Sequence, residues 1–228
     1  MKIADILKNN RVTVSFEVFP PKEWSKIENT KAVIAEMAKS KPAFMSVTYG
    51  AAGTRTGFTT EIAQAIKENG ITPLSHLTCL TSTKDKIDDV LNEWNAAGIE
   101  NILALRGDIP DGFEFPSNQH FHHASELVSE IKSNGDFCVG AACYPEIHPE
   151  SANRVEDINH LKEKVDCGVD FLTTQMFFDN DVFLRFKENC LIKGINVPII
   201  AGIMPITNAN QIKRSVELSG CAFPKKFQ

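Results

Sequence analysis

Arg106, Gly107 and Asp108 directly follow a short apolar run, residues 102–105. A basic side chain, a glycine and an acidic side chain therefore meet where a buried strand is predicted to end. Glycine permits a tight turn and lets a ligand approach the backbone closely. Parallel α/β proteins place their ligands at the carboxyl ends of their strands. Taken alone, the three residues also fit a solvated surface turn, so the rest of the chain has to decide between the two readings.

Polar side chains also occur near the ends of other predicted strands. They are Glu17, Thr48, Tyr49, His76, Thr78, Tyr144 and Gln175. Glu17 is flanked by Phe16, Val18 and Phe19, and burial among them would raise the pKa of its carboxyl group. A carboxyl group that stays protonated near neutral pH can act as a general acid. The alternative for Glu17 is a charged position on an exposed strand face.

Strand-like runs alternate with amphipathic helical runs along the whole chain. Strands are predicted over residues 12–19, 43–49, 72–79, 101–105, 137–144, 170–175 and 197–204, and helices over 27–39, 59–70, 83–97, 121–132, 156–165, 182–190 and 208–218. The steps between Glu17, Thr48, His76, Arg106, Tyr144 and Gln175 are 31, 28, 30, 38 and 31 residues. A βα repeat of about 30 residues indicates a (β/α)₈ TIM-type barrel. A doubly wound open sheet is the alternative, but no GxGxxG follows a predicted strand.

Composition excludes several classes of protein. The chain has 228 residues, of which 43% are hydrophobic and 23% charged, with a net charge of −5, so neither nucleic acid nor an anionic membrane is expected as a partner. The amino-terminal residues lack the pattern of a signal peptide, and no run is long enough for a membrane span. The six cysteines form no CxxC pair, which favours buried thiols in a reducing cytoplasm. We expect a single domain over residues 1–228.

No metal site or nucleophile motif is predicted. His120, His122 and His123 lack carboxylate or thiol partners at ligand spacing, so we expect a solvated loop and no bound metal. The chain contains no HExxH, P-loop or GxSxG motif, which leaves a metal-dependent barrel hydrolase as a distant alternative. Polar, largely uncharged strand ends suit a large planar ligand that is held by hydrogen bonds and stacking.

Seven short motifs at these strand ends resemble, in order, those of the methylenetetrahydrofolate reductase family. They are Ser15-Phe-Glu-Val-Phe-Pro-Pro21, Ser46-Val-Thr-Tyr-Gly50, His76-Leu-Thr-Cys79, Leu105-Arg-Gly-Asp108, Tyr144-Pro-Glu-Ile-His-Pro-Glu150, Thr174-Gln-Met-Phe-Phe-Asp179 and Gly202-Ile-Met-Pro205. The resemblance implies a (β/α)₈ barrel that carries FAD without a Rossmann fold. It also implies reduction of 5,10-methylenetetrahydrofolate to 5-methyltetrahydrofolate by hydride from NADH or NADPH through the flavin, as part of one-carbon metabolism and methionine biosynthesis.

The resemblance assigns roles to individual residues. Glu17 falls on the general acid, which protonates a folate ring nitrogen as the methylene bridge opens to an electrophilic iminium. Asp108 falls on the acidic residue beside the flavin, which tunes its potential and meets the folate. Gln175 and Gln211 fall on folate-facing positions. The flavin-contacting positions are Thr48, Tyr49, Ala51, His76, Arg106, Gly107, Asp108, Ala124, Tyr144, His148, Asp157 and Lys164. The chain departs from the family pattern at His123, His160 and Glu163.

The end of the chain motivates a second hypothesis. After the helix predicted over residues 208–218, ten residues that include Pro224 remain, too few for an eighth strand and its helix. We therefore expect a fragment whose first and seventh strands have open edges, with Val12, Val14, Ile199 and Ile200 on them. The alternative function is a non-catalytic flavin- or folate-binding remnant, or a subunit of a larger assembly. We otherwise expect a homo-oligomer, whose size the sequence does not fix.

Overall fold

The computed structural model describes residues 1–9, 12–21, 23–49, 57–108, 118–208 and 211. The chain divides into two compact units, residues 1–140 and 141–228, and each unit is described separately below. The strands are β1 (Ser15–Val18), β2 (Phe44–Val47), β3 (Thr72–Thr78), β4 (Asn101–Leu105), β5 (Cys138–Cys143), β6 (Phe171–Thr174) and β7 (Ile199–Ile200). The helices are α1 (Ile3–Asn9), η1 (Trp24–Lys26), α2 (Ile27–Ala38), α3 (Gly57–Glu68), α4 (Lys84–Ala96), α5 (Ala124–Asn134), α6 (Arg154–Asp166) and α7 (Asn180–Ile192).

The strand order is β1-β2-β3-β4-β5-β6-β7, the order of the sequence. The pairs β1–β2, β2–β3, β3–β4 and β6–β7 are parallel, and a helix follows each of β1 to β6. A doubly wound sheet would reverse its strand order at a switch point. The sequential order therefore confirms the TIM-type α/β fold that the 30-residue spacing predicted, with seven strands among the residues that the structure describes.

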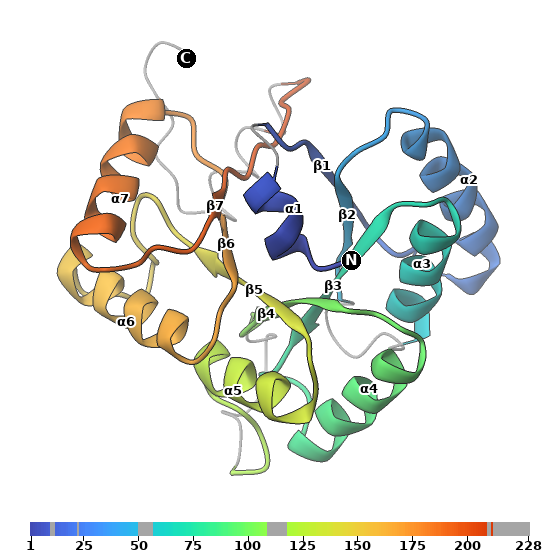
Figure 1. Ribbon diagram of the computed structural model, residues 1–228, viewed down its shortest axis with the longest axis horizontal. Coiled ribbons are helices and arrows are strands. Elements are labelled where there is room, and N and C mark those ends of the chain that lie inside the picture. The colour runs from blue at the N-terminus through green and yellow to red at the C-terminus, as the bar shows by residue number, and fades with distance from the viewer. Residues whose placement is uncertain (10–11, 22, 50–56, 109–117, 209–210, 212–228) are drawn as a thin grey trace. The chain divides into compact units, whose positions relative to one another are not determined.

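Unit 1 has a core of apolar strand and helix residues. All four residues of β2 are buried, as expected for a parallel strand that is covered on both faces. Helix α3 packs on β2 and β3 and also on α2 (Figure 1), while α5 packs on β4. Trp94 of α4 is fully buried, and its Nε1 donates a hydrogen bond to Thr60 Oγ1 at 3.0 Å. The helices of unit 1 thus pack against its strands and against one another.

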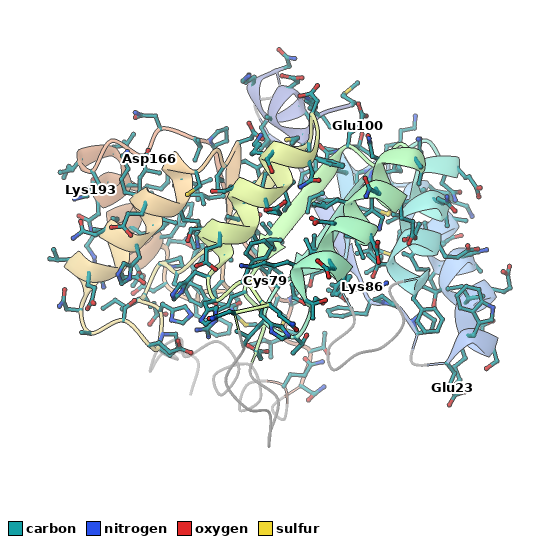
Figure 2. All side chains as sticks on the ribbon, turned by 90° about the horizontal axis from the view of Figure 1, so that it is seen from below. Glu23, Cys79, Lys86, Glu100, Asp166 and Lys193 are labelled. Carbon is teal, nitrogen blue, oxygen red and sulfur yellow. The ribbon has the colours of Figure 1, made fainter. Side chains whose placement is uncertain are left out.

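Helix α1, which is absent from the elements predicted above, lies at the amino ends of β3 and β4. Ile3 and Ile6 are buried on its inner face. The Asn101 side chain joins the helix to the sheet, because it accepts a hydrogen bond from the Ile3 backbone and donates one to Pro73 O at 3.2 Å. Figure 2 shows Glu100 beside this helix and Cys79 towards the other end of the strands. Two ends of unit 1 are thus distinguished, and α1 covers the amino end.

The first strand is shorter than its predicted range. Residues 12–14 precede β1, where Val12 is 84% exposed and Val14 is 57% exposed. Both valines were expected on an open strand edge. β1 lies at one end of the strand order, with β2 as its strand neighbour. An exposed position for Val12 and Val14 is consistent with the place of β1 at the end of the strand order of the described residues.

In unit 2, β7 is also shorter than predicted. Ile199 and Ile200 pair with Leu172 and Thr173 of β6, and residues 201–207 form no regular element. Gly202, in this segment, lies close to the end of β6. Its backbone nitrogen donates a hydrogen bond to Thr174 Oγ1 at 2.9 Å, and a Cβ at this position would lie only 2.2 Å from Thr174 O. Most of the helix predicted over residues 208–218, and the expectation for residues 219–228, lie outside the described part of the chain.

Candidate active site

Glu17, Ser46 and His76 meet near the carboxyl ends of three neighbouring strands of unit 1. The parallel register places Ser46 of β2 directly beside Glu17 of β1, and Ser46 Oγ donates to Glu17 Oε2 at 3.4 Å. His76 Nε2 lies 3.6 Å from the same Oε2 atom. Ser46 and His76 are buried, whereas the Glu17 side chain is 48% exposed. One carboxylate oxygen is thus flanked by two buried side chains while the rest of the group remains open.

The electrostatics of this cluster favour neutral side chains. Burial raises the pKa of the Glu17 carboxyl group, and the hydrogen bond from Ser46 partly opposes this shift. Burial lowers the pKa of His76 to about 4, so its imidazole is neutral at physiological pH. The direction of the Glu17 shift agrees with the argument from its apolar neighbours. The Glu17 side chain is more exposed than its apolar sequence neighbours predicted, because Phe19 beside it is itself exposed.

Thr48 and Tyr49 follow β2, and their surroundings differ. The Thr48 backbone nitrogen donates to Val18 O at 3.2 Å, and its carbonyl accepts from Thr59 Oγ1 at 3.3 Å. The Tyr49 ring lies edge-on to Trp94, with ring centroids 6.5 Å apart. Burial raises the pKa of the Tyr49 hydroxyl, and a hydrogen bond with Ser82 opposes the shift. Tyr49 therefore packs against helix α4. Ala51, the next predicted contact, lies outside the described residues.

The turn predicted after β4 is present. Gly107 has a φ angle of 86°, in the left-handed region that favours glycine. A Cβ on Gly107 would lie 3.1 Å from Thr78 Cβ. The preceding carbonyl, of Arg106, accepts hydrogen bonds from Cys79 N at 3.3 Å and Leu80 N at 3.0 Å, which ties this turn to the end of β3. Asp108 is exposed and directly follows the turn.

Unit 2 brings together four of the predicted cofactor contacts around the end of β5 and helix α6. The rings of Tyr144 and His148 meet edge to face, with centroids 4.6 Å apart. His148 Nδ1 accepts a hydrogen bond from the Glu150 backbone at 3.1 Å, so the proton of a neutral His148 is on Nε2. Asp157 Oδ1 accepts from His148 N at 3.3 Å and from the Ser151 hydroxyl at 2.8 Å.

Lys164 is the basic residue among the four predicted cofactor contacts of unit 2. Its Nζ donates to Ala142 O at 2.7 Å, beside the end of β5. Burial lowers the pKa of Lys164, while Cys143 and Asp157 act in the opposite direction. A partly desolvated ammonium group is suited to binding an anionic ligand.

The remaining predicted contacts lie at element ends. Ala124 is the first residue of α5. Gln175 follows β6, and its Oε1 accepts from Met176 N at 3.0 Å. Gln211 Oε1 accepts from Thr207 N at 2.7 Å, so this amide oxygen serves the local turn. Ser46 opens one of the sequence motifs without a role, and Ser151 was not singled out by the sequence; each is bonded to a proposed functional carboxylate, Glu17 and Asp157 respectively. The βα spacing, which aligns Ser46 with Glu17, was the signal that could have indicated the first.

Three further findings concern the described residues. They contain no group of three or more His, Cys, Asp or Glu side chains arranged to hold a metal ion. In the histidine-rich segment, the backbone nitrogens of His122 and His123 donate to the Glu126 carboxylate, at 2.6 and 3.4 Å, so this segment begins helix α5. None of the described helices has the length and apolar character needed to cross a bilayer.

Seven parallel strands in sequence order, with polar side chains at their carboxyl ends, define a TIM-type α/β protein. Residues 2–228 match the family model for methylenetetrahydrofolate reductase. The chain is 39% identical over 218 residues to 5,10-methylenetetrahydrofolate reductase of Buchnera aphidicola from Schizaphis graminum, covering 95% of this chain and 73% of the relative. It is 38% identical over 215 residues to the Escherichia coli protein of the same name, covering 94% and 71%. The chain therefore belongs to the methylenetetrahydrofolate reductase family.

A solved structure shares the fold at low sequence identity. It is a protein from Clostridium thermocellum that is described as binding two copies of 5-methyl-5,6,7,8-tetrahydrofolic acid. The TM-score is 0.71 at 14% identity, over 99% of this chain and 77% of that protein. This likeness supports the TIM-type fold independently of the family match.

Proposed function

We propose that this chain reduces 5,10-methylenetetrahydrofolate to 5-methyltetrahydrofolate, with FAD as the cofactor and Glu17 as the general acid. The observation that carries the proposal is the Glu17 carboxyl group, whose pKa is raised by burial and whose Oε2 lies between Ser46 and His76. A general acid must hold its proton near the operating pH and still reach the substrate. The names of the relatives supply the substrate class.

The residues of each unit fit the demands of FAD. In unit 1, the buried His76 ring and the Gly107 turn lie near the ends of the neighbouring strands β3 and β4, where TIM-type barrels bind their ligands. In unit 2, the partly desolvated Lys164 can neutralise a phosphate, and Tyr144 with His148 offers a flat face and a ring N–H. The residues that would hold FAD, as the resemblance assigns them, are Thr48, Tyr49, Ala51, His76, Arg106, Gly107, Asp108 and Ala124 of unit 1, and Tyr144, His148, Asp157 and Lys164 of unit 2. When bound, FAD supplies the transfer of hydride from NADH or NADPH to the folate.

The chain's own contribution to the chemistry is proton transfer and charge stabilisation. As the methylene bridge opens, one C–N bond breaks, its electron pair stays on the folate ring nitrogen, and Glu17 delivers the proton to that nitrogen. This leaves a cationic iminium on the substrate, which the Asp108 carboxylate would stabilise. The half-exposed Glu17 side chain can regain a proton from solvent. Gln175 would meet the pterin edge through its amide nitrogen, because its oxygen accepts from Met176 N.

The setting of the reaction is part of the same proposal. Composition and the lack of CxxC pairs favour the cytoplasm, and a homo-oligomer is the expected assembly. The choice between NADH and NADPH is left open, because no Rossmann fingerprint is available to indicate it. The second hypothesis, a flavin- or folate-binding chain without turnover, differs only in the final hydride transfer.

The experiment that tests the proposal separates two half-reactions of the purified chain. We expect the chain to bind FAD, the bound FAD to be bleached by NADH or NADPH, and the bleached protein to be reoxidised by methylenetetrahydrofolate with formation of 5-methyltetrahydrofolate. A well-folded chain that binds no FAD contradicts the proposal. A chain whose FAD is reduced by the nicotinamide but is never reoxidised by the folate supports the second hypothesis instead.

A further inference from the structure

His76 combines two features that the general-acid role of Glu17 leaves unexplained. Its side chain lies on β3 and is only 6% exposed as a residue, and its Nε2 has no hydrogen-bond partner among the described residues. The carboxylate oxygen Glu17 Oε2, on β1, lies 3.6 Å from this nitrogen. A buried ring nitrogen that makes no hydrogen bond lowers stability, so native proteins rarely retain one without a reason.

The separation is just beyond hydrogen-bonding range, and the more mobile partner can close it. A hydrogen bond from a carboxyl group to a ring nitrogen needs a heavy-atom distance of about 3 Å. His76 is held in the buried centre of β3, whereas the Glu17 side chain is 48% exposed and has free torsions. A small rotation of Glu17 therefore brings Oε2 onto Nε2. The other residue on that oxygen, Ser46, donates a hydrogen bond at 3.4 Å from β2.

We propose that His76 is a positioning residue for Glu17, in which the neutral imidazole accepts a hydrogen bond at Nε2 from the protonated carboxyl group and so holds the acid proton ready for the folate nitrogen. The proposal rests on the proposed function for the role of that proton, but not for the hydrogen bond itself. The imidazole does not take the proton from Glu17 near neutral pH, because burial lowers the pKa of His76 to about 4. His76 keeps its own proton on Nδ1, and no covalent bond is formed or broken.

His76 and Ser46 then act on Glu17 in opposite directions. An acceptor stabilises the protonated carboxyl group and raises its pKa, whereas a donor stabilises the carboxylate and lowers the pKa. The structure places these two side chains, from β3 and β2, against Glu17 Oε2, and His76 is the titratable one of the pair. The balance between them sets the pH range over which Glu17 remains an acid.

Two amide substitutions distinguish this role from mere packing. In H76Q the side-chain amide reaches the place of the His76 Nε2 atom, whereas in H76N it reaches only the place of Nδ1. The two variants therefore carry the same amide group and differ only in its distance from the backbone. The pKa of Glu17 is measured in the full chain with FAD bound, from the carboxyl carbonyl band in infrared difference spectra against E17Q. We expect H76N to lower the Glu17 pKa by about half a unit to one unit, as the loss of one hydrogen bond implies. H76Q should keep it near the wild-type value, and S46A should raise it.

The opposite results overturn the proposal. If H76N and H76Q leave the Glu17 pKa equal, or if H76N raises it, the imidazole is not an acceptor for Glu17. Circular dichroism checks the fold of each variant, and H76F, which fills the ring volume without a polar atom, replaces H76N if that variant does not fold, with the same expected decrease. The infrared titration needs no folate turnover. A shift in H76N without any reductase activity would therefore support the His76 contact and contradict the proposed function.

Discussion

Asn101 Oδ1 accepts a hydrogen bond of 2.8 Å from the backbone nitrogen of Ile3, which lies 98 residues earlier in the chain. The Asn101 Nδ2 atom donates to Met1 O at 3.0 Å and to Pro73 O at 3.2 Å. One buried amide thus ties the amino-terminal segment to the starts of β3 and β4. Salt bridges from the Met1 amino group to Glu100 and from Lys2 to Asp136 reinforce this attachment. Helix α1 thus lies against the amino ends of these strands, whereas the polar residues of the candidate site lie towards the carboxyl ends.

The first prediction follows from this network. In N101D an ionised carboxylate would face two carbonyl oxygens, so we expect its pKa to rise and the free energy of unfolding at neutral pH to fall by about 2–4 kcal/mol. An acid with a raised folded-state pKa contributes stability below its unfolded value, about 3.9, and loses it as the pH rises through the folded value. Urea unfolding at two pH values should therefore show N101D recovering towards about pH 4.

The control for N101D is N29D, at an exposed position of helix α2. It introduces the same carboxylate without the facing carbonyl groups, and we expect little change in stability at either pH. Equal losses in N101D and N29D would show that the Asn101 network does not hold α1 in place.

The second prediction concerns the turn after β4. Gly107 and Gly70 have similar left-handed φ angles, 86° and 77°. A Cβ on Gly70 meets nothing within 4 Å, whereas a Cβ on Gly107 lies 3.1 Å from Thr78 Cβ. G70A should lose about 1–2 kcal/mol of unfolding free energy from the φ angle alone, and G107A should lose at least about 1 kcal/mol more because of crowding. Urea unfolding measures both, and equal losses would contradict the tight contact with Thr78.

The third prediction concerns the desolvated cation of unit 2. Burial lowers the pKa of Lys164 from its ordinary value of 10.5, so between the lowered value and 10.5 the unfolded chain binds more protons than the folded chain. The unfolding free energy of the wild type should therefore rise relative to K164M as the pH increases through that window. K164M should also bind FAD about tenfold more weakly or worse, if Lys164 makes a charge-assisted hydrogen bond to a phosphate.

K193M is the matched control for K164M, because Lys193 is exposed after helix α7. It removes the same charge from a solvated position, and neither the pH dependence of stability nor the affinity for FAD should change. An unfolding free energy that runs parallel with pH for wild type and K164M would show that Lys164 is not desolvated in the folded chain.

The fold could be predicted because its signals are local. Gly98, Gly107 and Gly168 end apolar or helical runs, and the repeat of about 30 residues indicates a parallel sheet with short connections. Helix α1 escaped prediction because its stability comes from Asn101 and the sheet rather than from its own seven residues. Strand β7 was overestimated because the apolar run around it continues beyond the pairing with β6. The close approach of Gly202 to Thr174 is a tertiary contact that no spacing reveals.

The sequence predicted which residues lie near the strand ends, but not which of their side chains contact one another. Glu17 stood out because a carboxyl group among apolar neighbours is unusual, and its raised pKa has the expected direction. The partners of Glu17 come from strands about 30 and 60 residues away, and only the register brings Ser46 and His76 to the same oxygen. Tyr49 remains a predicted flavin contact, and the edge-on contact of its ring with Trp94 is a tertiary contact that the sequence did not indicate.

The most direct test of the account is the folate half-reaction of E17Q. The amide keeps the shape of the side chain and removes the acid proton, so reoxidation of the reduced protein by methylenetetrahydrofolate should slow by about 10²–10⁴-fold. Reduction of bound FAD by the nicotinamide should proceed as in the wild type, and E23Q, at an exposed position before η1, should leave both steps unchanged. Rapid-mixing absorbance spectroscopy follows both steps. If E17Q is reoxidised by the folate at the wild-type rate, Glu17 is not the general acid.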